Sequence, residues 1–222
     1  MNAPDTVAAA ADILLRTDAG GVATLTLNRP GQYNALSEEL LNAVIAVLEA
    51  IEKDDSVRVV VLAANGPAFC AGHDLKQMRA NPDRDYYRQL FALCSRMMMT
   101  VTRIPQPVIA RVHGIATAAG CQLVAQCDLA VAVESARFAV SGINFGLFCS
   151  TPSVSLGRNV LRKQAMEMLL TGEFIDAHTA RDYGLVNRVV PADQLDAEVA
   201  NLAQRILDKS AVAVATGKRM FY

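Results

Sequence analysis

Two stretches decide the fold of this chain: Phe69-Cys70-Ala71-Gly72-His73-Asp74-Leu75 and His113-Gly114-Ile115-Ala116-Thr117-Ala118-Ala119-Gly120-Cys121-Gln122. Each follows an apolar, β-branched run, at 57–63 and 107–112, that predicts a buried strand. Each is therefore expected where the chain leaves a sheet and enters a helix. The first backbone N–H groups of a helix have no partner within it, so two such loops that converge would form an oxyanion hole.

The segments around these loops predict alternating strands and helices. Residues 13–27 predict a hairpin that turns at Gly20 and Gly21. Ser37 predicts the N-cap of a helix whose apolar residues recur on one face up to Ile51. Further strands are predicted at 129–133, 138–140 and 187–190, and further helices at 84–103, 163–170, 176–183 and 193–209. This alternation indicates an α/β fold with right-handed crossovers and stacked ββα turns.

Several separated motifs together resemble the crotonase superfamily, also called the enoyl-CoA hydratase/isomerase family. Besides the two loops they are, in family order, Asn28-Arg29-Pro30, Asn34-Ala35-Leu36, Cys127-Asp128 and Thr171-Gly172-Glu173. The resemblance runs from about Ile13 to the C-terminus and implies a crotonase-like spiral of ββα units with a helical C-terminal part. We expect a disordered arm over 1–12, the spiral core over 13–192, and over 193–222 the start of a C-terminal helical region that is shortened relative to the family.

The resemblance also implies how the site works. The backbone amides of His73 and Ala119 would hold the thioester carbonyl of an acyl-CoA. Coenzyme A is then part of the substrate, and no separate cofactor is expected. Its moiety is expected to lie against eight further residues: Gly31, Gln32, Tyr33, Ala71, Gly72, Asp74, Leu75 and Gly120.

Two positions depart from the family pattern. Family hydratases carry two glutamates that act as the acid and the base in adding water across the enoyl double bond. This chain has Gln122 at the first position and Gly142 at the second, and neither can exchange a proton near neutral pH. We therefore expect an enzyme that polarises the thioester carbonyl and stabilises an enolate, with hydration in doubt. The alternative is a non-catalytic acyl-CoA binding or regulatory protein, or a subunit whose partner supplies an acidic residue.

Three side chains leave alternatives open. The ring of His73 could donate a proton, or His73 could be a solvent-facing loop residue of which only the amide is used; the second interpretation is favoured because no carboxylate is placed to orient the ring. Arg29 could meet a phosphate or be solvated surface. Cys149 could act as a nucleophile if its pKa were lowered, but its apolar neighbours Leu147 and Phe148 favour an inert buried thiol.

Composition excludes several classes of function. With 222 residues, 52% of them hydrophobic, the chain can build one sizeable core, and its formal net charge of -1 argues against nucleic acid as a partner. No apolar run is long enough for a membrane span, and 1–12 has no signal-peptide pattern, so we expect a cytoplasmic location. Five cysteines without paired metal spacing indicate reduced thiols and no metal site. By resemblance, the oligomer is expected to be a homotrimer or a dimer of trimers.

Overall fold

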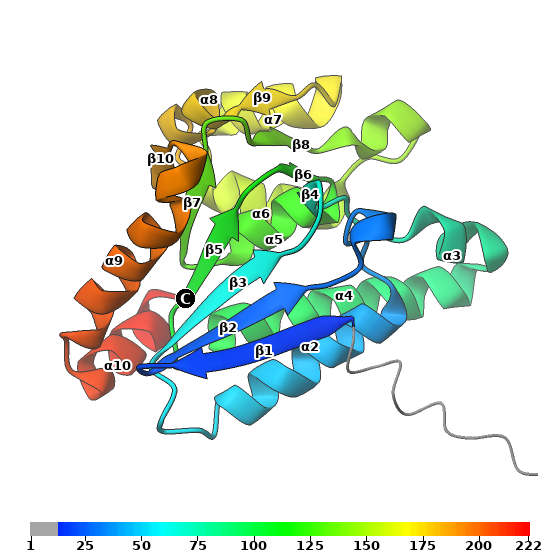
Figure 1. Ribbon diagram of the computed structural model, residues 1–222. Helices are drawn as coiled ribbons and strands as arrows, with labels where there is room; N and C mark the ends of the chain where they lie inside the picture. Colours follow the sequence, from blue (N-terminus) through cyan, green and yellow to red (C-terminus); the bar gives the residue numbers. More distant parts are fainter. Residues whose placement is uncertain (1–12) are drawn as a thin grey trace, which may run out of the picture.

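The computed structural model describes residues 13–222, and its centre is a six-stranded sheet (Figure 1). The strand order is β1-β2-β3-β5-β7-β10, and every neighbouring pair is parallel except the β1–β2 hairpin. The bounds are β1 Leu14–Ala19, β2 Val22–Leu27, β3 Val59–Ala64, β5 Val108–Val112, β7 Leu129–Val133 and β10 Arg188–Val190. The predicted strands are confirmed, with ends that move by one or two residues.

A second sheet lies beyond the ends of β3 and β5, and the sequence did not predict three of its four strands. Its order is β4-β6-β8-β9, with bounds β4 Ala68–Cys70, β6 Ile115–Thr117, β8 Arg137–Ala139 and β9 Ile175–Asp176. Strand β6 falls inside, and β4 overlaps, the two stretches that were expected to be loops, and β9 lies at the start of the helix expected at 176–183. Strands of three residues carry too little periodicity to be distinguished from a loop. Their parallel pairing, Ala68 with Ile115 and Cys70 with Ala116, holds the two stretches side by side.

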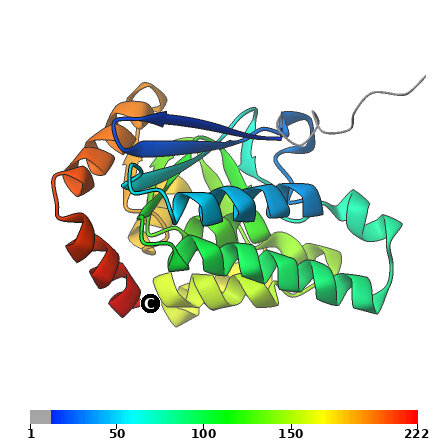
Figure 2. The same ribbon diagram turned by 90° about the horizontal axis from the view of Figure 1, so that it is seen from below.

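Two helices cover one face of the six-stranded sheet, as Figure 2 shows from below. They are α2 Glu38–Ile51 and α4 Arg84–Arg103, and both match the predicted segments. Ser37 caps α2 as expected, because its side chain accepts a hydrogen bond from the Leu40 amide. Ala23, Leu25 and Leu27 of β2 are fully buried on this side, so the α2 side of the sheet is the core.

The remaining helices continue the spiral: α5, α6 and α7 stack in turn beyond α4, and α9 covers the other face of the sheet. Their bounds are α3 Leu75–Ala80, α5 Ala119–Gln126, α6 Ser150–Asn159, α7 Arg162–Thr171, α8 Ala177–Asp182, α9 Leu195–Leu207 and α10 Ala211–Phe221, with short helices η1 Pro30–Gln32, η2 Ser141–Phe145 and η3 Ala192–Gln194. The predicted stop of α7 is confirmed, because Gly172 takes a left-handed conformation at its C-cap. Helix α9 contacts β3, β5 and β7 on the face opposite α2.

One buried ion pair attaches α10 to the body. The ammonium of Lys218 lies 2.7 Å from the Asp128 carboxylate and also donates to the carbonyls of Val101 and Gln106, both at 2.9 Å. Lys218 is the one buried residue of α10, and burial lowers the pKa of its ammonium. This helix is therefore held by polar contacts more than by apolar area.

The predicted domain boundaries stay predictions. The expected arm, residues 1–12, lies outside the described residues. Within residues 13–222 no helix is long and apolar enough to cross a membrane.

Candidate functional site

The first loop is held open by a neighbouring segment of backbone. The amide of Leu36 donates to the carbonyl of Gly72 at 2.8 Å, and the amide of Asp74 donates to the carbonyl of Leu36 at 3.3 Å. In this parallel bridge the amide between them, on His73, points away from Leu36. The backbone groups before and after His73 are therefore both hydrogen-bonded to Leu36. The N–H of His73 itself points away from that segment.

Asn34 anchors that neighbouring segment, a role the sequence reasoning missed. Its side chain is fully buried; the oxygen accepts from the Arg29 amide, and the nitrogen donates to the carbonyls of Asn65 and Ala68, each at 2.8 Å. Asn34 also has a φ of 54°, a left-handed conformation that asparagine tolerates better than most residues. Its place in the Asn34-Ala35-Leu36 motif was the available signal.

The second loop contains a strained residue directly before α5. Ala118 has φ 51° and ψ -121°, a conformation that normally requires glycine. Its own amide donates to the carbonyl of Ala139 at 2.9 Å, so the strand pairing fixes one side of the residue. The left-handed φ then reorients the following peptide unit, and the N–H of Ala119 becomes the first amide of α5.

Two glycines let the loops touch. A Cβ at Gly120 would lie 2.0 Å from the carbonyl oxygen of Cys70, and a Cβ at Gly72 would lie 3.1 Å from the Ala119 nitrogen. Only residues without a side chain permit this approach of β4 to α5 and of one loop to the other. The two stretches singled out in the sequence are thus in direct backbone contact.

The contact leaves two amides free. Across residues 13–222, neither the His73 nor the Ala119 amide donates a hydrogen bond to a protein acceptor. Buried and half-buried amides without a partner are uncommon in folded proteins. Two donors on adjoining loops, one at a helix N-terminus, suit a single oxygen that carries partial negative charge.

The imidazole of His73 turns inward, which corrects the solvent-facing interpretation. Its ring makes an edge contact with Phe91 of α4, with ring centroids 5.3 Å apart. Both ring nitrogens are buried and lack a hydrogen-bond partner among the described residues. Burial lowers the pKa of His73 to about 4, so the ring is neutral at physiological pH and has no proton to donate as an acid.

The two positions of the missing glutamates differ from one another. Gln122 lies on α5, is 5% exposed, and its Oε1 is buried without a partner among residues 13–222. Gly142 lies in η2, where a Cβ would meet the Leu147 carbonyl oxygen at 2.6 Å and the Cys149 sulfur at 2.7 Å. The second position therefore has no room for any side chain unless the loop moves.

Cys149 is not an activated nucleophile. The residue is buried, its sulfur accepts a 3.3 Å hydrogen bond from the Gly142 amide, and burial raises the pKa of its thiol. The other cysteines of the chain, Cys70, Cys94, Cys121 and Cys127, are likewise free and buried. Among residues 13–222 no cluster of three or more His, Cys, Asp or Glu side chains is placed to hold a metal ion.

The predicted coenzyme A surface is only partly available to a ligand. The amide of Ala71 donates to the Tyr33 carbonyl at 3.0 Å, so the segment with Gly31, Gln32 and Tyr33 does lie beside the first loop. Leu75 and Tyr33 are exposed there. The carboxylate of Asp74, however, caps α3 and pairs with Arg29 at 3.1 Å, and a second Arg29 nitrogen donates to the Ala35 carbonyl. Asp74 and Arg29 thus pair with one another, and this corrects the interpretation of Arg29 as solvated surface, while its contact with a phosphate stays a prediction.

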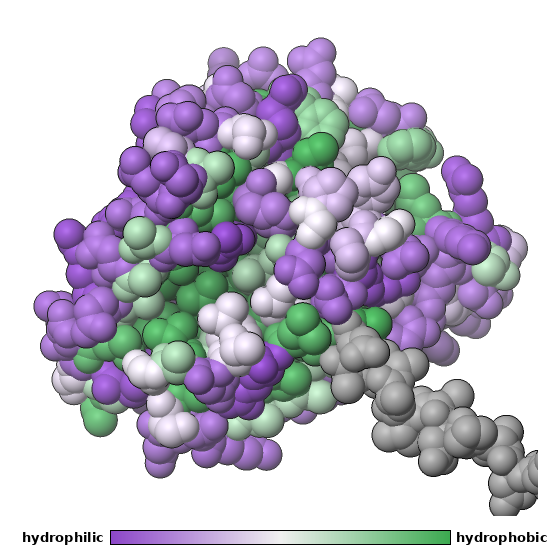
Figure 3. Space-filling model, in the orientation of Figure 1, coloured by the Kyte–Doolittle hydropathy of each residue, from purple (hydrophilic) through white to green (hydrophobic). Residues whose placement is uncertain are grey.

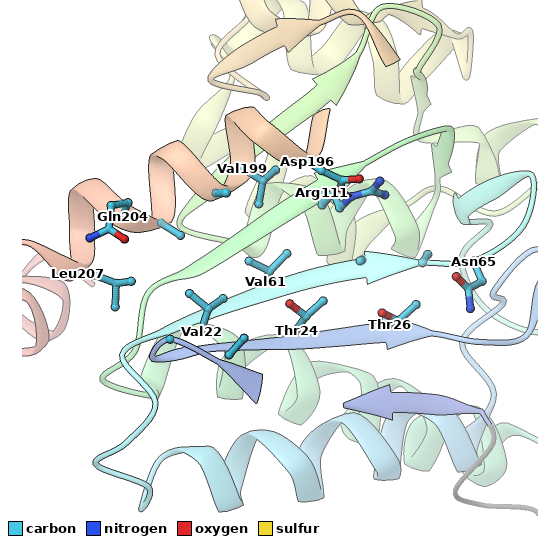
Figure 4. Close-up of a pocket in the computed structure, with 16 residues that line it drawn as sticks. Val22, Thr24, Thr26, Val61, Asn65, Arg111, Asp196, Val199, Gln204 and Leu207 are labelled. Carbon is cyan, nitrogen blue, oxygen red and sulfur yellow. Dashed lines mark hydrogen bonds and ion pairs between the residues drawn. The ribbon is translucent and has the colours of Figure 1, made fainter. Parts of the chain in front are cut away.

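A larger hollow lies elsewhere, between α9 and the outer face of β2 and β3 (Figure 3). This cavity of about 600 Å³ is lined by short side chains such as Thr24 and Val61 and closed at one end by the Arg111–Asp196 ion pair (Figure 4). It contains none of the predicted site residues. Its charged groups are paired with one another, so size alone does not make it the reaction site.

Comparison with known proteins shows the family to which this chain is similar over nearly its whole length. The family model described as "Enoyl-CoA hydratase/isomerase" matches residues 17–222. The chain is 47% identical to the mouse protein "Enoyl-CoA hydratase domain-containing protein 3, mitochondrial", over 91% of this chain and 67% of that protein. It is also similar to the crystal structure of an enoyl-CoA hydratase from Mycobacterium smegmatis, with a TM-score of 0.93, 61% identity, and coverage of 95% of this chain and 82% of that chain. The human domain-containing protein 3 structure gives a TM-score of 0.92 at 42% identity, covering 95% of this chain and 83% of that one.

These relatives correct one expectation and confirm another. Five vertebrate relatives that are 42–47% identical are named mitochondrial, so the expected cytoplasmic location is wrong. The expected fold is confirmed, because the α/β architecture with its parallel sheet matches these solved structures over nearly the whole chain.

Proposed function

Because the chain belongs to the enoyl-CoA hydratase/isomerase family, we propose that it binds an acyl-CoA thioester and polarises the thioester carbonyl between the amides of His73 and Ala119. The observation that carries this proposal is the pair of amides without an acceptor on two loops in direct contact. A carbonyl oxygen gains negative charge when its α-carbon becomes an enolate, and two preorganised donors stabilise that charge more than they stabilise the ground state.

In the mechanism that we propose, backbone N–H groups supply the electrostatic stabilisation of the carbonyl oxygen, and side chains contribute little. The N-terminal end of α5 adds a favourable dipole at the same oxygen. Gln122 is neutral, and Gly142 has no side chain, so neither protein group of the hydratase pair is there to move a proton. The thioester carbonyl is therefore activated, while proton transfer must come from the substrate, from water or from another chain.

A second candidate function is acyl-CoA binding without turnover. The observation in its favour is the crowding at Gly142, where the carbonyl of Leu147 and the sulfur of Cys149 occupy the room of a side chain. A site that had merely exchanged glutamate for glycine would keep that room. The crowding also means that Gly142→Glu would displace the loop, so Gln122→Glu alone is the usable test of restored acid/base chemistry.

The experiment that tests the proposal is an incubation of the protein with a panel of enoyl-CoA and acyl-CoA thioesters. Mass spectrometry follows added water, shifted double bonds and released coenzyme A, and calorimetry follows binding. The variant Ala119→Pro removes the donor N–H at the first position of a helix, where proline is tolerated. Turnover that is lost in this variant supports the enzyme, and binding without turnover supports the second candidate. Absence of both in a folded protein overturns the proposal.

A further inference from the structure

The hollow between α9 and the outer face of β2 and β3 combines an apolar lining with one arginine. Four of its apolar side chains face one another from the strands and the helix: Val22, Val61, Val199 and Leu207. Figure 3 shows hydrophobic residues gathered in this part of the surface. A cavity of about 600 Å³ lies in the size range of sites for small organic molecules. Among the described residues that line it, Arg111 is the one basic side chain.

The strand register brings Arg111 into line with the outward-facing residues of β2. Thr26 of β2 pairs with Ala63 of β3. Leu62 of β3 pairs with Ala110 of β5, so the residues that follow, Ala63 and Arg111, lie side by side on the face of Thr26. Neighbouring strands are about 4.8 Å apart, which places the Cα atoms of Thr26 and Arg111 about 10 Å from one another. Only the methyl group of Ala63 lies between them, so the space above it is open to a polar head group.

The guanidinium of Arg111 keeps donor groups that the protein does not use. Its Nε donates to the Asp196 carboxylate at 2.5 Å, and the arginine side chain is 24% exposed. Across residues 13–222 its two terminal nitrogens donate to no protein acceptor. The Asp196 side chain is 81% exposed, so water screens its charge and weakens the ion pair. Arginine binds a carboxylate best through two parallel N–H groups, and the pair on the terminal nitrogens is available for that.

We propose that this hollow binds an unbranched aliphatic carboxylate, with its head group on the terminal nitrogens of Arg111 and its chain between α9 and the two strands. The inference is independent of the proposed function, because none of the predicted site residues lines the hollow. Helix α9 lines it from Asp196 to Leu207, about 16 Å at 1.5 Å per residue, and this length suits an extended chain. Burial of that chain against apolar side chains adds affinity to an ion pair that is itself partly screened.

The charge of the hollow sets the class of its ligand. A single guanidinium that already holds one carboxylate matches a head group of one negative charge, whereas the phosphates of coenzyme A carry several. The Thr26 hydroxyl lines the same end and is able to donate to that head group. An alcohol of equal chain length fills the apolar part as well as the acid does, but it brings no charge to Arg111. Comparison of the acid with the alcohol therefore measures what the arginine contributes.

Calorimetric titration of the whole protein with decanoate, decanol and butyrate tests this site. Decanoate should bind at least about tenfold more tightly than decanol, the ratio that one hydrogen bond to a charged group gives, and also more tightly than butyrate, which lacks the chain. Arg111→Gln should lower the ratio of decanoate to decanol affinity below about threefold. Asp196→Asn removes the competing negative charge and should leave the ratio at or above its wild-type value. Arg205→Gln, an exposed position of α9 that does not line the hollow, is the matched control and should leave it unchanged.

A second variant tests the apolar part of the hollow. Ala200 is an exposed residue of α9 that lines it, so Ala200→Phe places a ring in the room of the chain without disturbing the core. This variant should weaken the binding of decanoate and of decanol alike, each by at least about tenfold.

Three outcomes would overturn the carboxylate site. The first is equal affinity for decanoate and decanol in the wild type, or a preference that survives in Arg111→Gln. The second is decanoate binding that is lost in Ala119→Pro and kept in Arg111→Gln, since the ligand then lies at the two amides of the proposed function. The third is no decanoate binding together with a larger mass in light scattering for the wild type than for Ala200→Phe, which would make the hollow an interface between two copies of this chain.

Discussion

Substitution of Gly120 by alanine tests whether the contact between the two loops builds the site. A Cβ at this position would lie 2.0 Å from the Cys70 carbonyl oxygen and 2.7 Å from its carbonyl carbon. Both neighbours are backbone atoms of β4, so no side-chain rotation can relieve the contact. To restore an ordinary contact of 3.4 Å, β4 and α5 must separate by about 1.4 Å.

The contact of the added Cβ with the Cys70 backbone sets the size of the expected losses of stability and of kcat in Gly120→Ala. Overpacking against a rigid neighbour costs up to about 3 kcal/mol, and replacing a helical glycine by alanine returns about 1 kcal/mol, so the net loss is about 2 kcal/mol. For a chain of this length that corresponds to a fall in Tm of about 4–8 °C. The same separation draws the Ala119 amide away from its proposed oxygen, and loss of one such donor lowers kcat by about 100- to 1,000-fold.

Thermal unfolding and turnover of an acyl-CoA thioester by Gly120→Ala, measured beside a matched control, check both numbers, and acyl-CoA binding is followed in parallel. Gly157→Ala in α6 is the control, because its Cβ would meet nothing within 4 Å and the residue is exposed on a helix. This variant should gain about 0.5–1 kcal/mol and keep its ligand binding. If Gly120→Ala is as stable as the wild type and binds acyl-CoA equally well, the loop contact does not shape the site and the reasoning is wrong.

Three further predictions concern other strained or buried groups. Ala118→Gly should raise the free energy of unfolding by about 1 kcal/mol in urea titration, since glycine accepts φ 51° without strain; an unchanged midpoint would count against strain at this position. Lys218→Met leaves the half-buried Asp128 carboxylate without its ammonium and with the Val108 amide still as a donor, so thermal denaturation should reveal a loss of about 3 kcal/mol, and a loss below about 1 kcal/mol would mean that the pair is effectively solvated. Burial holds the pKa of His73 at about 4 in the folded state against 6.5 when exposed, so between these pH values the unfolded chain binds the extra proton and stability falls as the pH drops, by up to about 3 kcal/mol. The slope over this window should be flatter in His73→Phe, and an equal slope in both proteins would show that His73 is not the group responsible.

Local sequence patterns were sufficient to predict longer elements such as α2, α4 and α7. The segment 84–103 is predicted and observed as one helix, because a capped start and a proline-ended apolar pattern are both local signals. Ser37 caps α2 for the same reason, and the glycine after α7 ends it as predicted. Strands β4 and β6 escaped prediction because their three residues are specified by pairing with each other rather than by their own periodicity.

By itself, the sequence determined the order of the longer strands and helices of the core, the positions of both glycine-containing stretches, and the absence of a proton carrier at Gln122 and Gly142. These properties depend on residue type and short-range spacing, which can be read along the chain. Only the tertiary structure decided that the two stretches touch, that the His73 ring turns in against Phe91, and that Gly142 has no room for a side chain. Each of those depends on contacts between segments far apart in sequence, where a difference of one or two ångströms separates an open site from a closed one.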